Sequence, residues 1–162
     1  MTSSPAIDAL KEALLMEYRG KALYESARNS AADPEVRDLF QELADEEQLH
    51  INTLGDRFKA LHRPGPTPGF PTHARKTVLT RSLAKAIAGA GYEAAVISAA
   101  IELEKAAIAF YDRAAGQAGE DEQRKLFAWL ADWEKGHLGL LADLDRELKE
   151  KVWFDHQFWP LD

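Results

Sequence analysis

Residues 45–50 read Asp-Glu-Glu-Gln-Leu-His, and residues 132–137 read Asp-Trp-Glu-Lys-Gly-His. Each stretch contains a Glu-x-x-His unit, which on a helix places a carboxylate and an imidazole on the same face, one turn apart. A Glu and, seven positions later, a Tyr precede each unit. The two units and the residues that precede them form a set of eight: Glu17, Tyr24, Glu47, His50, Glu104, Tyr111, Glu134 and His137.

The second half of this set repeats the first at a constant offset of 87 positions. Aligning residues 8–61 with residues 95–148 without a gap gives 54 pairs, of which 18 are identical. Two hairpins rich in Ala, Glu and Leu can match by composition, but a matched heptad register without a gap is harder to reach in that way. The sequence therefore predicts a duplicated helical hairpin.

The composition limits the class of protein. The 162 residues suffice for one domain with a buried core, and 46% apolar and 29% charged residues are typical of a helical globular protein. The net charge of −7 argues against nucleic acid as a partner, because phosphate binding needs a basic face. The absence of cysteine excludes thiolate metal sites and cysteine nucleophiles. We find neither a signal peptide nor an apolar run of the roughly 18 residues that a membrane span needs, so we expect a cytoplasmic protein with no membrane partner.

Apolar residues at heptad-like spacing predict four long helices. Ser4-Pro5 starts the first helix, and Asp33-Pro34 caps the second. Residues 81–88 can form a short helix after a proline-rich segment. We expect a single domain, 1–162, made of a helical hairpin (5–62), a crossover linker (63–91), a second hairpin (92–150) and an aromatic tail (151–162). The predicted inward stripe of the second helix consists of Leu39, Leu43, Glu47, His50, Leu54 and Leu61.

The length of the linker predicts the topology. A simple up-down-up-down bundle needs only a few residues between its second and third helices, whereas about 28 separate them here. At about 1.5 Å per residue the helices are about 40 Å long, so this segment is suited to crossing the length of the bundle. The second and third long helices would then run parallel. This is the all-α, ferritin-like four-helix bundle with one long crossover.

The inward polar residues of the two hairpins converge at one level of such a bundle. Four ionised carboxylates are very unfavourable in a core unless they are compensated. Two divalent cations would balance them, with neutral imidazoles completing the ligand sets. Two helices that each give one Glu and two that each give Glu-x-x-His are the ligand plan of dimetal carboxylate bundles. Oxygen and nitrogen donors suit iron or manganese. The predicted metal ligands are Glu17, Glu47, His50, Glu104, Glu134 and His137.

The paired Glu-x6-Tyr and Glu-x-x-His motifs resemble the rubrerythrin-like members of the ferritin-like superfamily over residues 8–148. This resemblance implies a non-haem centre with two iron ions, manganese being the alternative metal. It also implies activation of dioxygen or hydrogen peroxide, or oxidation of ferrous iron. The implied roles are terminal carboxylate for Glu17 and Glu104, bridging carboxylate for Glu47 and Glu134, nitrogen ligand for His50 and His137, and hydrogen-bond partner of a ligand for Tyr24 and Tyr111.

The chain departs from the family pattern in three ways. Rubrerythrins proper carry a further Glu one turn after the third-helix ligand, and here Ala107 and, in the first half, Gly20 stand at the matching positions. Without cysteine there is no rubredoxin-type iron centre, so a separate electron-donor protein is expected. Related sites often place an acidic residue just before Glu-x-x-His to orient the imidazole of the facing helix. Glu46 fits this role and Trp133 does not, so one histidine would lack a carboxylate partner and the two metal positions would be inequivalent.

Several residues also have a simpler explanation. Acidic residues beside the motifs are more often surface charges than partners of a ligand, and histidines in a linker or tail are solvent-exposed by default. Tyr24 and Tyr111 are equally compatible with plain core aromatics. The tail aromatics are expected to pack on their own bundle or on a second subunit. The expected surface residues are Asp45, Glu46, Glu102, Asp132, His62, His73 and His156.

The leading functional hypothesis is an enzyme, a di-iron oxidoreductase that reduces peroxide or dioxygen or oxidises ferrous iron. One alternative is a ferritin-like iron-binding protein without a cage. Another is a di-iron hydroxylase of an organic substrate, for which the small residues Ala99, Ala100, Ala106 and Ala107 leave room. The metal-free alternative is a helical interaction module, whose stability would not respond to a chelator. We expect a homodimer, because twofold dimers are the commonest assemblies.

Overall fold

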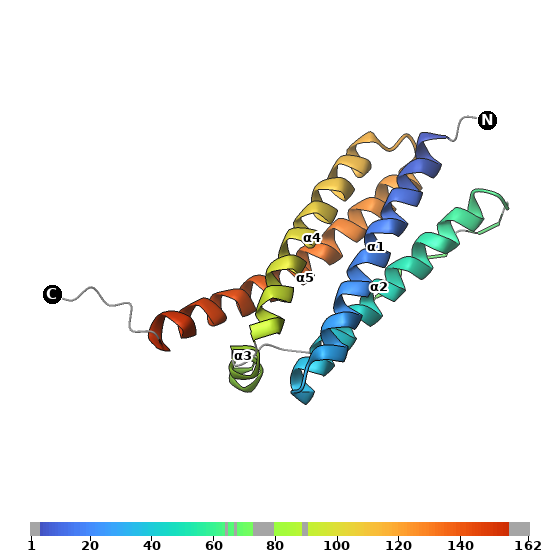
Figure 1. The fold of residues 1–162 in the computed structure, drawn as a ribbon. Helices are drawn as coiled ribbons and strands as arrows, with labels where there is room; N and C mark the ends of the chain where they lie inside the picture. The colour runs from blue at the N-terminus through green and yellow to red at the C-terminus, as the bar shows by residue number, and fades with distance from the viewer. Residues whose placement is uncertain (1–3, 64, 67, 73–79, 89–90, 156–162) are drawn as a thin grey trace.

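The computed structural model describes residues 4–63, 65–66, 68–72, 80–88 and 91–155. Every regular element within these ranges is a helix, and four helices of 26 to 35 residues form an elongated bundle (Figure 1). None of these helices is both long and apolar enough to cross a membrane. The elements are α1 (Pro5–Ser30), α2 (Pro34–Ala60), α3 (Arg81–Ala88), α4 (Gly91–Gln117) and α5 (Asp121–Asp155).

The first two helices begin where a side chain satisfies the backbone amides of the first turn. The hydroxyl of Ser4 accepts a hydrogen bond from the amide of Ile7. The carboxylate of Asp33 accepts from the amides two and three positions further on. A proline follows each cap, at the first helical position, where a backbone N–H would have no partner within the helix. Both predicted helix starts are therefore confirmed.

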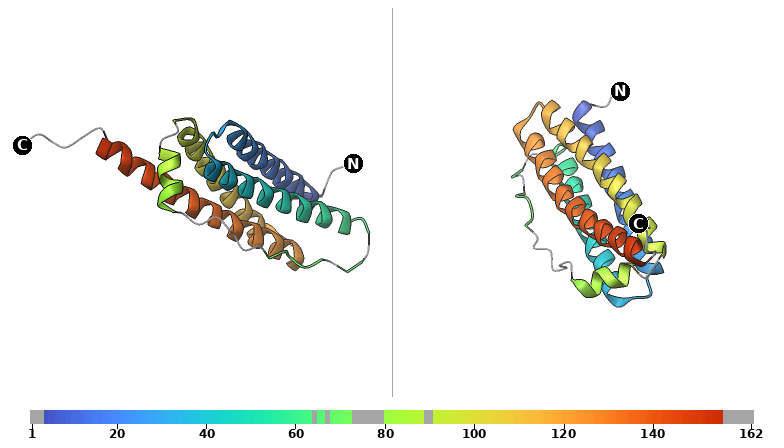
Figure 2. Two further views of the ribbon diagram at one scale, coloured as in Figure 1. Left: turned by 90° about the horizontal axis from the view of Figure 1, so that it is seen from below. Right: turned by 90° about the vertical axis from the view of Figure 1, so that its left-hand side faces the viewer.

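The long helices form two antiparallel hairpins joined by a crossover. α1 packs mainly on α2, and α4 packs mainly on α5. α2 ends at one end of the bundle and α3 lies at the other, so that α2 and α4 run in the same direction (Figures 1 and 2). Parallel second and third long helices joined by one long connection define the ferritin-like topology. The predicted all-α, ferritin-like bundle is confirmed.

The crossover is attached to the side of the bundle through Phe70. Its ring stacks on Trp129 of α5, with ring centroids 5.5 Å apart and an interplanar angle of 15°. The guanidinium of Arg57 lies 4.7 Å from the centroid of the Phe70 ring. Arg57 also donates hydrogen bonds to the carbonyl of Pro68, at 3.1 Å, and to Glu122, at 3.2 Å. Arg57 therefore connects α2, the crossover and the start of α5, which explains the burial of this arginine.

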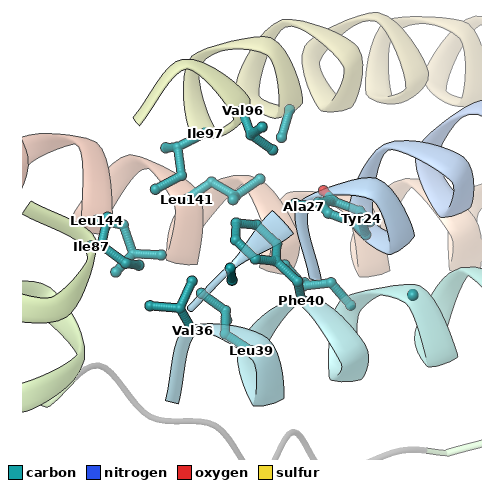
Figure 3. Close-up of a cluster of buried hydrophobic side chains, with 14 of the residues drawn as sticks. Tyr24, Ala27, Val36, Leu39, Phe40, Ile87, Val96, Ile97, Leu141 and Leu144 are labelled. Carbon is teal, nitrogen blue, oxygen red and sulfur yellow. The ribbon is translucent and has the colours of Figure 1, made fainter. Parts of the chain in front are cut away.

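The short helix α3 closes one end of the bundle. It spans the predicted residues, and its apolar side chains Leu83 and Ile87 are buried. They belong to the larger of two hydrophobic clusters, to which all five helices contribute (Figure 3). The crossover thus supplies both a side contact and an end cap.

A layer of polar residues separates the two hydrophobic clusters. In α1, Leu10 and Ala13 belong to one cluster, Ala27 belongs to the other, and the buried Glu17 lies between them. The other three long helices show the same order of apolar, polar and apolar segments along their buried faces. The bundle therefore has three levels, and the polar level is enclosed by apolar ones on both sides.

Two details differ from the predictions. Leu61 was expected on the inward stripe but is 48% exposed, because α2 ends at Ala60 and Leu61 is its C-cap. α5 continues to Asp155, beyond the expected end near residue 150, because no helix-breaking residue occurs before Pro160. The side chains of the predicted aromatic tail lie outside the described residues.

The duplicated core can be tested with a matched pair of substitutions. Leu43 and Leu130 are equivalent in the repeat, are fully buried and belong to different clusters. Leu43→Ala and Leu130→Ala should each lower the free energy of unfolding by about 2–5 kcal/mol, because each leaves a cavity. Leu15→Ala, at a position that is 50% exposed, should change it by less than about 0.5 kcal/mol. Urea unfolding measures all three, and destabilisation by only one of the two core variants would contradict equivalent core roles for the two leucines.

Candidate metal centre

All six predicted ligands lie in the polar layer. Each is at most 2% exposed, since the heptad-like spacing directs all of them toward the bundle axis. The six predicted ligands therefore bring four carboxyl groups and two imidazoles into a space from which bulk water is excluded. The predicted ligands are Glu17 from α1, Glu47 and His50 from α2, Glu104 from α4, and Glu134 and His137 from α5.

These residues form two overlapping groups that could each hold a metal ion. In each group, one ligand atom of every member lies within 4.8 Å of the others. Glu47 and Glu134 belong to both groups. Two carboxylates shared between two positions are arranged as bridging ligands would be. The first position is completed by Glu17 and His50, and the second position by Glu104 and His137.

The Nδ1 atoms of both histidines face the carboxylates. Nδ1 of His50 is 3.0 Å from Oε2 of Glu17 and 3.0 Å from Oε1 of Glu134. Nδ1 of His137 is 2.9 Å from Oε2 of Glu134 and 3.1 Å from Oε1 of Glu47. The two imidazole rings have centroids 5.9 Å apart and an interplanar angle of 27°. Nδ1 is therefore the nitrogen that each ring would offer to a metal ion.

Three carboxylate oxygens at the centre of the layer are buried and accept no hydrogen bond from the described residues. They are Oε1 of Glu47 and both oxygens of Glu134. An imidazole Nδ1 lies within 3.1 Å of each of these oxygens, but not in hydrogen-bond geometry. Ionised carboxylates at this depth are very unfavourable unless their charge is compensated, and a cation between the two shared carboxylates would compensate it. Four carboxylates and two imidazoles are a donor set that suits iron or manganese. The residues present thus fit a pair of such ions.

Without a metal ion, burial and mutual interaction set the charges of the layer. Burial, with repulsion from the shared carboxylates, raises the pKa of Glu17 and Glu104 well above the ordinary value. Burial alone would lower the pKa of His50 and His137, but the attraction of Glu134 outweighs it and raises both well above the ordinary value. Burial alone would raise the pKa of Glu134, but the two imidazoles hold it well below its ordinary value. The metal-free layer therefore binds protons where cations would otherwise compensate the charge.

Tyr24 and Tyr111 connect the two hairpins. The hydroxyl of Tyr24 in α1 donates to Oε1 of Glu104 in α4, at 2.5 Å. The hydroxyl of Tyr111 in α4 donates to Oε1 of Glu17 in α1. Burial, with repulsion from Glu104 and Glu17 respectively, raises the pKa of each phenol well above its ordinary value, so both hydroxyls keep their protons. The tyrosines therefore contact predicted ligands and are more than core aromatics.

Glu46 is not the surface charge that its position beside the motif suggests. It is 2% exposed, and its Oε2 accepts hydrogen bonds from Nε2 of His137 and, at 3.2 Å, from the indole Nε1 of Trp133. The surface expectation for Glu46 is therefore wrong, and its alternative role beside the facing histidine agrees with these contacts. Two adjacent faces of α2 are buried, one toward α1 and one toward α5, so that neighbouring residues of this helix both point inward.

At the equivalent position of the repeat, Trp133 presents a ring where Glu46 presents a carboxylate. The Trp133 ring lies edge-on to His50, with centroids 5.1 Å apart and an interplanar angle of 84°. Trp129 makes a similar contact, at 5.4 Å and 79°. Nε2 of His50 is buried without a hydrogen-bond partner among the described residues. Sequence reasoning did not identify Trp129, because it lies one turn before the motif and carries no ligand atom.

Gly20 leaves space for a shared carboxylate. A Cβ atom at this position would lie 3.3 Å from both Cδ and Oε2 of Glu47 and 3.6 Å from Cδ2 of Leu103. The closer contacts would push the Glu47 carboxylate by a few tenths of an ångström. Glycine is therefore the residue that leaves Glu47 undisturbed. Its equivalent in the repeat, Ala107, is buried as well.

The remaining polar residues named from the sequence lie away from the layer. Asp45, Glu102 and Asp132 are exposed, as expected. His62 is exposed, and its Nδ1 lies 2.9 Å from the carbonyl oxygen of Phe58. His73 and His156 lie outside the described residues.

Comparison with known proteins identifies the family. Residues 8–145 match the protein family described as Rubrerythrin. No curated protein and no solved structure matches the chain significantly. The matched segment includes all eight residues of the repeated motifs and most of the chain. The chain therefore belongs to the rubrerythrin family.

Proposed function

We propose that this protein is a non-haem di-iron oxidoreductase, which reduces hydrogen peroxide or dioxygen, or oxidises ferrous iron, in the polar layer of the bundle. The observation that carries the proposal is the pair of ligand groups that share Glu47 and Glu134. Membership of the rubrerythrin family supports iron as the metal. Manganese, with the same donor preferences, is the alternative.

In this proposal the charges of the four ligand carboxylates and of the metal pair cancel. The shared carboxylates of Glu47 and Glu134 would help to hold both ferrous ions, and the four carboxylates would balance their four positive charges. Each ion also receives one Nδ1 atom. The bound ions thereby replace the protons that the metal-free layer binds. The assigned ligands are Glu17 and His50 at the first position, Glu104 and His137 at the second, and Glu47 and Glu134 at both.

When bound, the iron pair would supply the electrons that reduce the oxidant. The residues of the chain hold the carboxylates in place, and the two hydrophobic clusters keep bulk water away from them. In the water-excluded layer, the hydrogen bonds from Tyr24 and Tyr111 are stronger than they would be in water. Because the chain contains no cysteine, we propose that a separate donor protein returns electrons to the centre.

The structure gives less support to a hydroxylase of an organic substrate. Room for such a substrate was considered along four small residues of α4. Ala100 and Ala107 are buried in the core, whereas Ala99 and Ala106 are exposed. These residues therefore lie on different faces of the helix and do not line one channel.

Reconstitution with ferrous iron tests the proposed centre. The metal-free protein should bind two iron ions per chain, one for each ligand group. Adding peroxide should then change the near-ultraviolet absorption as the iron is oxidised. Both results should disappear in a Glu104→Ala, Glu134→Ala double variant, which lacks one terminal and one shared carboxylate. Metal analysis and optical spectroscopy provide the measurements.

The control for this experiment removes two carboxylates from the same helices without touching the layer. Glu102 and Asp132 are exposed, so a Glu102→Ala, Asp132→Ala variant should bind iron as the wild type does. A wild-type protein without stoichiometric iron, and equally stable with and without chelator, would overturn the proposal in favour of an interaction module. Oxidation rates with peroxide and with dioxygen then identify the preferred oxidant.

Removing a tyrosine hydroxyl should weaken iron binding. Tyr24→Phe and Tyr111→Phe each delete one hydrogen bond to a ligand carboxylate. Loss of such a partner typically lowers metal affinity by about 10- to 100-fold, and the two effects should be similar because the contacts are equivalent. Competition with a coloured chelator measures the affinity. Tyr18→Phe, at a position that is 55% exposed, is the control, and an effect as large at Tyr18 would contradict a role of these hydroxyls at the centre.

The stability of the protein should respond to pH and metal together. Without metal, the raised pKa values of Glu17, Glu104, His50 and His137 contribute stability that is present at low pH and lost as the pH rises through them. The melting temperature of the metal-free protein should therefore fall between about pH 5 and about pH 8. Metal binding displaces these protons, so the increase in melting temperature on adding ferrous iron should grow over the same range.

The lowered pKa values of Glu47 and Glu134 affect stability in the opposite direction and in a lower pH range. Glu47 and Glu134 contribute stability that is lost only as the pH falls below the ordinary carboxyl range. Thermal unfolding followed by circular dichroism, under anaerobic conditions, distinguishes these ranges. A metal-free protein that becomes more stable from about pH 5 to about pH 8 would contradict the protonated layer.

A further inference from the structure

We propose that the two metal positions are inequivalent, and that Glu46 makes the position at His137 bind its ion more tightly and fill first. This inference rests on the proposed function, because it assumes that both positions bind metal. It concerns a residue that is not itself a ligand in either group. Glu46 is therefore a positioning residue, which acts on the metal through an imidazole.

The inequivalence stands out because the layer is otherwise closely symmetric. Each terminal carboxylate accepts a hydrogen bond from the tyrosine of the other hairpin. Each histidine presents Nδ1 to the shared carboxylates. Positions 46 and 133 are related by the same offset of 87, yet one holds an acid and the other an aromatic residue. The repeat therefore supplies an internal comparison between a histidine with a carboxylate partner and one without.

The carboxylate of Glu46 sets which nitrogen of His137 carries a proton. Its Oε2 accepts a hydrogen bond from Nε2, which holds that proton on Nε2 and leaves the lone pair of Nδ1 for a metal ion. The indole N–H of Trp133 donates to the same oxygen, at 3.2 Å, and so helps to hold the carboxylate in place. A carboxylate behind a ligating imidazole makes the imidazole a stronger donor and fixes its orientation.

The imidazole of His50 packs against two tryptophan rings and has no such carboxylate partner at Nε2. Trp129 and Trp133 lie edge-on to the imidazole, and its buried Nε2 has no hydrogen-bond partner among the described residues. Packing against two rings restrains the orientation of His50 but provides no negative charge. The imidazole of His50 is therefore the weaker donor, and the ion beside it lacks the additional anion that Glu46 provides near the other ion.

The known effect of carboxylates behind ligating histidines gives the expected difference in metal affinity between the two positions. Mutating the carboxylate behind a ligating histidine typically costs about 10- to 100-fold in metal affinity. We therefore expect the two dissociation constants to differ by at least about 10-fold. Repulsion between two bound ions also separates the constants of a symmetric site, so variants are needed to assign the difference to Glu46.

Titration of the full-length, metal-free protein with Mn²⁺ tests the inference, with the free ion followed by electron paramagnetic resonance. Glu46→Gln should weaken the first binding step by about 10-fold or more. Trp133→Glu places a second acid opposite His50 and should strengthen the second step by about 10-fold. Trp133→Gln, which has the same shape as the introduced Glu without its charge, is the matched control. A gain of affinity in Trp133→Glu alone would not arise from a merely structural role.

Variants that lack one of the two histidines show at which metal position Glu46 acts. His50→Ala retains the histidine of the second position alone, and His137→Ala retains that of the first. Adding Glu46→Gln should weaken Mn²⁺ binding in the His50→Ala background and leave it unchanged in the His137→Ala background. Equal effects in the two backgrounds, or two binding steps that neither Glu46→Gln nor Trp133→Glu changes, would overturn the inference while leaving the di-metal proposal intact. A wild-type protein that binds no stoichiometric Mn²⁺ or ferrous iron would overturn the proposed function itself.

Discussion

The burial of five carboxyl groups in one layer, four of them predicted ligands and the fifth Glu46, is the constraint on which the rest of the structure depends. Glu47 and Glu134 meet at the centre with oxygens that accept no hydrogen bond from the described residues. Such a layer is stable only if protons or cations compensate its charge. The two hydrophobic clusters above and below supply the packing that holds these groups together. The stability of the core and the capacity to bind metal are therefore consequences of the same arrangement.

The duplication explains how this arrangement forms. Each hairpin contributes two Glu residues, one His and one Tyr to the layer, and neither hairpin alone forms a complete ligand group. Tyr24 donates a hydrogen bond to Glu104 and Tyr111 donates one to Glu17, so the hydrogen bonds to these two carboxylates connect different hairpins. The long crossover allows the two hairpins to face each other with parallel central helices, and Phe70 attaches it to the bundle on the way. The centre can therefore form only when the two hairpins are docked.

The departure from symmetry at positions 46 and 133 has a clear physical meaning. A carboxylate and an indole occupy equivalent places, and the indole N–H donates to the carboxylate. A second acid at position 133 would have added a sixth buried carboxyl group to the four predicted ligands and Glu46. Trp133 avoids that charge and covers His50 together with Trp129. The two ends of the centre therefore differ electrostatically while they share the same ligand types.

Much of this protein follows from the sequence by itself, because helical periodicity converts spacing into geometry. The steps of three and four residues between Glu17, Tyr24 and their apolar neighbours define one inward stripe, and the constant offset between the halves predicts the equivalent stripe on the other hairpin. The length of the linker predicted the ferritin-like topology because the rise per residue fixes the length of a helix. A linker of this length can cross the whole bundle, whereas a short turn cannot. Periodicity does not determine whether a second helix also covers the face beside the inward stripe. Only the packing of α2 against α5 decided that Glu46 is buried, that it contacts His137, and that His50 lies against two tryptophans, because these contacts join residues that no local pattern relates.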